Sequence, residues 1–304
     1  MTHAQLTAAR ADKSVLLGIL LMLLGVGLFS FGDALGKYLV ASYAVGQLLL
    51  FRACAALLML SPFIWRARKE FSTLPRPGLQ LLRVTLSAFE IAAFFAAIAW
   101  LPLADVITFY MASPIFVTAL SALVLGERVG WRRWCAVGIG FCGVMIAMKP
   151  STQAASWPAL IGLAGALAFG GLMVVTRYLR GTSDIALAST QFASSLTLGA
   201  VMAPFGWVAP ATSDLALFAL AACISLGALL CVNRSLKLAP ASVVVPYQYT
   251  MIVWAAIFGY VVFGDVPSIE IVIGALIIAA AGIYIFLRER KLARDDEPTS
   301  MPPA

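Results

Sequence analysis

The sequence is dominated by apolar segments that are each long enough to cross a lipid bilayer. A helix needs about 20 mostly apolar residues to span the hydrocarbon core, and short connections separate these segments. Only 12% of the residues are charged, whereas a soluble domain has about 25%. We therefore predict an all-α integral membrane protein with ten transmembrane helices. The predicted spans are 15–38, 46–65, 79–100, 103–125, 131–148, 157–177, 185–206, 214–236, 241–263 and 268–287.

The distribution of Lys and Arg predicts the orientation of these spans. Short cytoplasmic loops are enriched in positive residues. With the N-terminus inside, eighteen of the 21 Lys and Arg residues fall in cytoplasmic segments; Lys37 and Lys149 fall outside, and Arg52 lies within the second span. We predict that the N- and C-termini are both cytoplasmic. The net charge of +7 then reflects topology, and no nucleic-acid partner is expected.

The two halves of the chain resemble each other. The segment LPLADVITFYMASPIFVTALSALVLGER begins at residue 101, and APASVVVPYQYTMIVWAAIFGYVVFGDV begins at residue 239. An offset of 138 pairs Pro102 with Pro240 and Gly126 with Gly264. Each half would contain five spans, and because five is odd, the second half enters the membrane inverted. Two inverted five-helix repeats are a recurring plan of secondary transporters.

The repeat defines the predicted domain organisation. Residues 1–14 form a cytoplasmic N-terminus, 15–150 the first five-helix repeat, and 151–290 the second, inverted repeat. Residues 291–304 are charged and then rich in proline, which is typical of a disordered tail.

Four charged residues lie within the predicted spans, where charge is costly and usually faces a cavity or a partner. Asp33 and Lys37 are four residues apart, so they share a helix face and could form a local pair. Arg52 lies at a similar depth to Asp33, and either a structural ion pair between them or a role in substrate binding fits the sequence. Glu90 lies near the middle of the third span. It fits a proton-coupling or substrate-amine site, or a carboxyl group bonded to a neighbouring helix.

The segment PYQYTM, residues 246–251, places polar side chains in an otherwise apolar span. Unpaired polar groups in lipid cost several kcal/mol, so these groups need partners. Pro246 removes a backbone donor and predicts a helix kink, as does Pro114. The segment could form hydrogen bonds between helices, or it could line a wet cavity. Helical spacing places Tyr247, Thr250 and Trp254 on one face.

The sequence resembles a known family through its duplicated unit, with LVLGER closing the fourth span and the glycine-spaced AVGIGFCGVMIAM in the fifth. These features are similar to the drug/metabolite transporter superfamily and its EamA-type exporters, most of all to the YddG-type exporters of aromatic amino acids. The resemblance covers residues 14–290. Asp265 stands where the family usually has Glu. The resemblance also implies that the protein is located in the bacterial inner (plasma) membrane.

The resemblance implies that the fourth and ninth spans line a central cavity, and it favours the cavity interpretation of PYQYTM. No cofactor, ATPase subunit or metal is expected, since His3 is the single histidine and the five cysteines form no CxxC motif. The predicted cavity residues are Glu90, Phe94, Phe109, Tyr110, Met111, Ser113, Tyr247, Gln248, Tyr249, Thr250 and Trp254, with Asp33, Lys37 and Arg52 as further coupling or structural charges.

These features predict a secondary transporter in the lipid bilayer that exports small amphipathic metabolites by alternating access, above all amino acids including aromatic ones. An exporter of nucleosides, purines or drug-like cations, or a non-transporting scaffold, is the alternative. An enzyme is not expected, because the spans contain no histidine and few acidic groups.

Overall fold

The computed structural model describes residues 3–72, 75–98, 100–101, 103–127, 129–149, 157–264, 266 and 268–295. All of the regular structure in these ranges is helical. The elements are α1 (His3–Val40), α2 (Val45–Arg66), α3 (Arg68–Ser72), α4 (Pro77–Ile98), α5 (Leu103–Tyr110), α6 (Ser113–Val124), α7 (Trp131–Met148), α8 (Ala159–Tyr178), α9 (Asp184–Met202), α10 (Thr212–Leu238), α11 (Ala241–Val244), the 3₁₀ helix η2 (Val245–Thr250), α12 (Met251–Phe258), the π-helix η3 (Gly259–Phe263) and α13 (Ile269–Asp295).

Seven segments of the described chain are long and apolar enough to cross a membrane. They correspond to α1, α2, α5 with α6, α8, α9, α10, and α11 through η3. The other three predicted spans form the helices α4, α7 and α13. The all-helical membrane architecture is thus confirmed, and the count of ten spans stays a prediction.

Two predicted spans are interrupted at their prolines. The fourth divides into α5 and α6 at Met111–Ala112, and Pro114 lies in the first turn of α6. The ninth changes to a 3₁₀ helix where Pro246 occurs. Because proline has no backbone N–H and crowds the preceding turn, it favours such breaks. At the C-terminus, α13 continues to Asp295, so residues 291–295 are helical rather than disordered. Residues 296–304 lie outside the described part of the chain.

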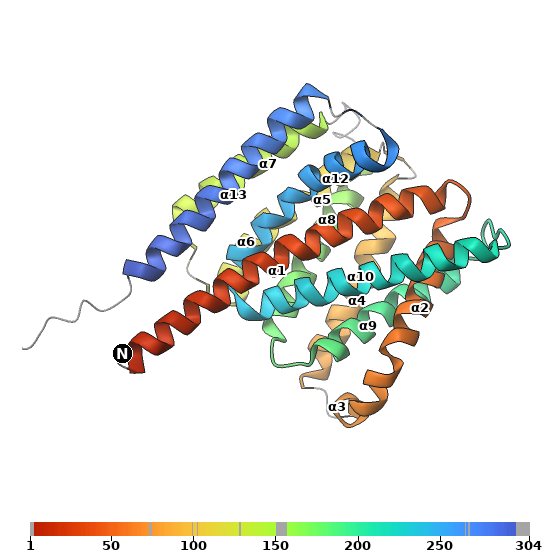
Figure 1. Cartoon of the computed structure of the whole chain (residues 1–304), viewed down its shortest axis with the longest axis horizontal. Helices are drawn as coiled ribbons and strands as arrows, with labels where there is room; N and C mark the ends of the chain where they lie inside the picture. Colours follow the sequence, from red (N-terminus) through yellow and green to blue (C-terminus); the bar gives the residue numbers. More distant parts are fainter. Residues whose placement is uncertain are drawn as a thin grey trace, which may run out of the picture.

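The long helices pack in pairs that each join the two halves of the chain. Figure 1 shows α1 beside α10, α2 beside α9, and α7 beside α13, and α4 packs on α8. If each helix is replaced by its counterpart in the other predicted repeat, the same four pairs result. Glycines allow the close approach, since a Cβ atom on Gly25 would lie 2.8 Å from Val232 Cγ2 and one on Gly274 would lie 2.5 Å from the Gly143 carbonyl oxygen.

The start of α1 and the end of α13 lie at the same end of the molecule (Figure 1). An even number of membrane crossings would produce this arrangement. The inverted orientation of the two halves and the cytoplasmic location of the termini stay predictions.

Arg83 forms a buried hydrogen-bonded connection between α4, α8 and α9. Its side chain is 1% exposed. The guanidinium donates to Thr176 Oγ1 at 2.9 Å, to the Leu187 carbonyl oxygen at 2.9 Å and to Gln191 Oε1 at 2.6 Å. Arg83 was counted with the cytoplasmic Lys and Arg residues at the start of the predicted third span, and in the structure it lies within α4 and contacts the neighbouring helices.

We expect Arg83→Ala to destabilise the bundle by about 1–3 kcal/mol, because it leaves buried acceptors without a donor. A thermal unfolding assay in detergent checks this. Arg132→Ala is the matched control, since Arg132 is exposed. Equal melting temperatures for the two variants would contradict a structural role of Arg83.

Candidate functional site

Three charged side chains from different helices form an electrostatic cluster inside the bundle. Arg52 of α2 attracts both Asp33 of α1 and Glu90 of α4. Asp33 is exposed to solvent, and Arg52 and Glu90 are partly exposed. The Arg52 Nε atom has no hydrogen-bond partner. A charge that faced lipid would be costly, so partial exposure within a helical bundle indicates a solvent-accessible space between the helices.

The inner face of α1 shows where this space opens. Residues spaced three or four apart share one face of a helix. Along this face, the residues nearest the start of α1 are buried and the later ones are exposed. The buried residues are Ile19, Met22, Val26 and Ser30, and the exposed ones are Asp33 and Lys37. The space therefore opens toward the end of α1 at Val40 and is closed toward its start.

Hydrogen bonds join the helices at the open end. Gln47 donates through Nε2 to the Val208 carbonyl oxygen at 2.6 Å and accepts from Val208 N at 2.9 Å. The Tyr43 hydroxyl donates to Asp214 Oδ2 at 2.6 Å, and this bond raises the pKa of Tyr43 because it favours the protonated phenol. These contacts connect the turn after α1 and the start of α2 to the loop before α10 and to the first turn of α10.

A capped helix start closes the opposite end. Glu127 accepts hydrogen bonds from Ala241 N at 3.0 Å, Ser242 N at 3.1 Å and Ser242 Oγ at 2.5 Å. Arg133 donates to the same Ser242 Oγ at 2.7 Å. Arg177 lies 3.9 Å from Glu127 and donates to the last carbonyl oxygens of α10. We call Glu127, Arg133, Arg177 and Ser242 the latch.

The PYQYTM segment lies in the packed region beside the latch. Tyr247, Gln248 and Tyr249 are all buried. Tyr247 packs with Met22 and Val26 of α1 and donates to the Gly282 carbonyl oxygen at 3.2 Å. Thr250 Oγ1 donates to the Tyr247 carbonyl oxygen at 2.7 Å. The segment thus faces a protein interior in this conformation.

Two polar groups in this packed segment have no hydrogen-bond partner, namely Gln248 Oε1 and the Tyr249 hydroxyl. The Tyr249 ring lies against Gly140, where a Cβ atom would be 2.6 Å from Tyr249 Cδ2. Met111 packs in the same cluster as Tyr249. Buried polar atoms without partners are uncommon in proteins, so a conformation that hydrates them would relieve a cost present here.

Aromatic residues from α4, α5 and α8 adjoin Glu90. Phe94 meets Tyr110 edge to face at 5.3 Å, and Phe169 lies 6.3 Å from Tyr110. The Tyr110 hydroxyl donates to the Glu90 carbonyl oxygen. The Phe109 ring lies against Gly162 of α8. The structure therefore brings Glu90, Phe94 and Tyr110 together, and Phe109 packs in the same cluster as Phe94 and Tyr110.

A second aromatic group connects α1 and α12. Trp254 packs on Gly27, where an added Cβ atom would lie 3.2 Å from Trp254 Cε2. It stacks on Phe258 at 6.1 Å, and Phe258 lies 5.2 Å from Phe31. Trp254 is partly exposed, in contrast to Tyr247 and Tyr249. It therefore lies closer to the accessible region than the rest of its predicted group.

The sequence did not identify the latch, although its GER motif contains Glu127. That motif alone does not show which helix start Glu127 caps. Ser113, a predicted cavity residue, is fully buried and its hydroxyl has no partner. Among the described residues, no group of three or more His, Cys, Asp or Glu is arranged to hold a metal ion.

A bundle of apolar, membrane-length helices with charged side chains within the predicted spans is typical of membrane transporters. The model of the EamA-like transporter family matches residues 16–149 and 156–288. The chain belongs to this family.

Curated relatives cover nearly the whole chain and handle several kinds of metabolite. An S-adenosylmethionine uptake transporter of Rickettsia prowazekii is 26% identical over 92% of this chain and 96% of the relative. A riboflavin transporter of Rhizobium johnstonii is 30% identical over 79% and 80%. A pseudopaline exporter, CntI, of Pseudomonas aeruginosa is 29% identical over 88% and 95%. None of the three is named an amino-acid exporter, so these relatives do not support the YddG-type assignment, and they include both uptake and export.

A solved crystal structure has the same fold, with a TM-score of 0.73 over 92% of this chain and 98% of the other. The two sequences are 17% identical. This likeness concerns the fold alone.

We expect the latch to control access to the PYQYTM segment. In a variant whose native cysteines are replaced, Gln248→Cys should react slowly with a polar thiol reagent, because position 248 is buried. Adding Glu127→Ala removes the cap of α11, which is worth about 0.5–2 kcal/mol, and should raise the rate by about 2- to 30-fold. Labelling rates measured by mass spectrometry check this.

Lys37→Cys is the control for this experiment, since position 37 lies at the open end and should react rapidly with or without Glu127. Equal slow labelling of position 248 in both backgrounds would contradict the gating role of the latch.

Proposed function

We propose that this protein is a secondary transporter of small amphipathic metabolites that carry an α-amino and a carboxyl group. The proposal rests on the electrostatic attraction of Arg52 to carboxylates on two other helices, Asp33 and Glu90, each of which is at least partly exposed. An amino acid is the simplest such metabolite, and export is the direction that the family resemblance predicts.

The charges match those of a zwitterion. A guanidinium presents donors in a rigid fork that fits a carboxylate, and the Nε atom of Arg52 is buried without a hydrogen-bond partner in this conformation. Asp33 and Glu90 can each accept hydrogen bonds from an ammonium group. Because a zwitterion brings both charges, it can replace the attraction between Arg52 and the protein carboxylates without leaving a charge unpaired.

The relatives agree with this chemistry in part. S-adenosylmethionine carries an amino acid group, and the relatives named for its uptake cover over nine-tenths of this chain. The aromatic residues Tyr110 and Phe94 near Glu90, and Trp254 on α12, provide apolar faces for the remainder of such a molecule.

A second candidate is a transporter of planar ring compounds such as riboflavin. The stack of Trp254 and Phe258, together with the 30% identical riboflavin transporter, favours this candidate. In this case the aromatic residues would provide most of the binding energy and the charges would mainly hold the helices together.

We propose that transport proceeds by alternating access between the two ends. In the conformation described, the end near Tyr43 is open and the latch closes the other. If the N-terminus is cytoplasmic, the open end faces the outside. In the opposite conformation, the Glu127 cap would release, and the polar groups of Gln248 and Tyr249 would line the inner half of the path. Rocking of repeated units around a midplane site is a known means of such exchange.

Uptake of labelled compounds into liposomes containing the purified protein tests this proposal. The panel is phenylalanine, methionine, S-adenosylmethionine, riboflavin, uridine and a lipophilic cation. We expect saturable uptake of the compounds with an amino acid group, and loss of that uptake by tenfold or more in Arg52→Gln, because a charged hydrogen bond contributes about 1.5–3 kcal/mol.

Tyr260→Phe is the control, because Tyr260 is exposed on η3 and is not part of the site. Uptake of riboflavin alone, unchanged in Arg52→Gln, would favour the second candidate. No uptake of any of these compounds by folded protein would exclude both.

We further expect Glu90 to couple transport to protons. Its carboxyl group attracts Arg52, so protonation would release Arg52 for a substrate carboxylate. A pH gradient should stimulate uptake in the parent protein, and Glu90→Gln, which mimics the protonated form, should remove the stimulation while some uptake remains. The ratio of uptake with and without the gradient is the measurement. An unchanged ratio in Glu90→Gln would show that the carboxyl group is structural.

A further inference from the structure

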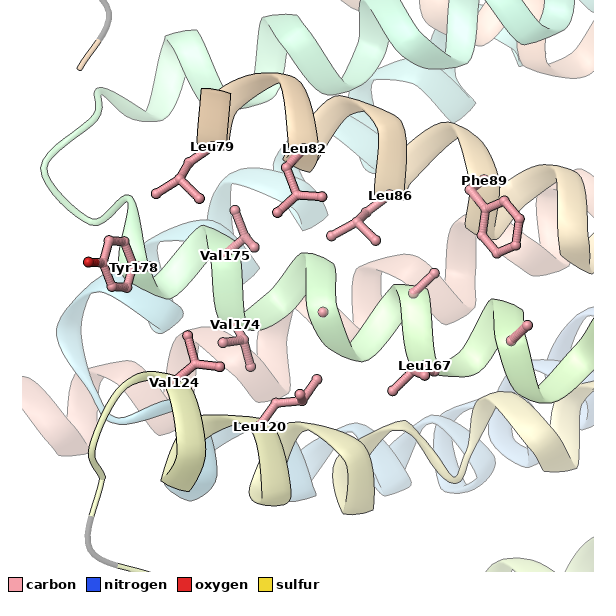
Figure 2. Close-up of a pocket in the computed structure, with 13 residues that line it drawn as sticks. Leu79, Leu82, Leu86, Phe89, Leu120, Val124, Leu167, Val174, Val175 and Tyr178 are labelled. Carbon is pink, nitrogen blue, oxygen red and sulfur yellow. The ribbon is translucent and has the colours of Figure 1, made fainter. Parts of the chain in front are cut away.

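An apolar groove runs along the outside of the bundle between α4, α6 and α8. It has a volume of about 790 Å³. Figure 2 shows leucine and phenylalanine side chains of α4 on one wall, Leu120 and Val124 of α6 on the other, and α8 between them. The lining residues are Leu79, Leu82, Leu86, Phe89, Leu120, Val124, Ala164, Leu167, Ala168, Gly171, Val174, Val175 and Tyr178.

This groove is distinct from the proposed transport site. Every residue that lines it is apolar except for the hydroxyl of Tyr178. On α4, the lining residues at 79, 82, 86 and 89 follow helical spacing along one face, whereas Arg83 is turned to α8 and α9. Phe89 and Leu82 are 49% and 43% exposed, so the groove is open on its outer side, where a membrane protein meets lipid.

One end of the groove carries a positive charge. The guanidinium carbon of Arg76 lies 4.6 Å from the centre of the Tyr178 ring, and Tyr178 closes the groove beside Leu79 (Figure 2). Arg76 and Arg180, two residues after Tyr178, are both exposed. This is also the latch end of the bundle, since Glu127 follows α6 directly. The Lys and Arg distribution predicts that this end is cytoplasmic.

We propose that the groove binds one anionic phospholipid of the membrane leaflet at the latch end. An acyl chain would lie along the leucine-lined wall, and the phosphate would meet Arg76 above Tyr178. A long apolar groove with a positive charge at one end matches a phospholipid, whose apolar acyl chain leads to a negatively charged phosphate. Basic groups at a membrane surface attract anionic headgroups, and the stacking on Tyr178 fixes the guanidinium at the mouth of the groove.

A lipid here would contact α6 and α8 close to the latch. Val124 lines the groove and lies three residues before Glu127, and Tyr178 follows Arg177 directly. The bound lipid would therefore hold together two of the segments that carry latch residues. This proposal rests on the protein being in a bilayer, and it does not depend on the identity of the transported metabolite.

Native mass spectrometry of the purified full-length protein tests the proposal. The protein is titrated with phosphatidylglycerol and with phosphatidylcholine that has the same acyl chains. We expect stronger retention of one phosphatidylglycerol molecule, and Arg76→Gln should weaken its binding about fivefold, as expected for one basic group at a membrane surface. Phosphatidylcholine binding should change little in this variant.

Two further variants separate the headgroup contact from the groove. Arg68→Gln is the matched control, because Arg68 is also an exposed arginine stacked on an aromatic ring, that of Trp65 at 5.5 Å, but Trp65 does not line the groove. It should leave binding unchanged. Ala164→Trp places a large side chain in the groove from an exposed position and should weaken the binding of both lipids.

Equal binding of the two lipids by the parent protein would overturn the proposal, as would equal losses in Arg76→Gln and Arg68→Gln. A second copy of the chain in the groove would also overturn it. That outcome would appear as a dimer in the mass spectrum that Ala164→Trp dissociates and that excludes phosphatidylglycerol.

Discussion

The arrangement of the bundle depends on how a guanidinium is accommodated among apolar helices. Arg52 cannot face lipid without a large cost, and it lies where two carboxylates from other helices attract it. This attraction draws α1, α2 and α4 around one space. Because the charges keep access to solvent, the space has to stay open at one end. The opposite end can then be sealed by apolar packing, and Met22 and Val26 do so on the same helix that carries Asp33.

The closed end combines two kinds of contact. At the latch, one carboxylate caps a helix start and two arginines surround it, so the contact consists of a few polar groups. Behind it, the Tyr247–Tyr249 segment is packed but leaves two polar atoms without partners. This combination suits a region with two conformations. In the closed conformation the latch hydrogen bonds are formed but the two buried polar atoms lack partners, whereas opening would hydrate these atoms and break the latch. The helix pairs that join the two halves of the chain form the scaffold within which the change between the two conformations can occur.

Much of the fold followed from the sequence because the bilayer imposes it. Span length and low charge predicted a helical membrane protein, and Pro114 and Pro246 predicted the places where regular helix is interrupted. The site was predicted less completely. Asp33, Arg52 and Glu90 were identified because charge within a span is conspicuous, and Glu90, Phe94 and Tyr110 do adjoin one another. Phe109 packs in the same cluster as Phe94 and Tyr110, with its ring on Gly162. The segment 245–250 is a 3₁₀ helix, whose narrower turn changes the faces that α-helical spacing predicts.

The sequence by itself determined that the chain lies in a membrane, which segments are helical, and which charges need a partner, since these follow from local hydrophobicity and from the cost of desolvation. Only the tertiary structure decided which partners those charges have. Arg83 lies near the start of its predicted span, and the packing of α8 and α9 buries it against Thr176 and Gln191. Glu127 caps a helix start more than a hundred residues away. Such contacts depend on how distant helices pack, and no local pattern of residues encodes that packing.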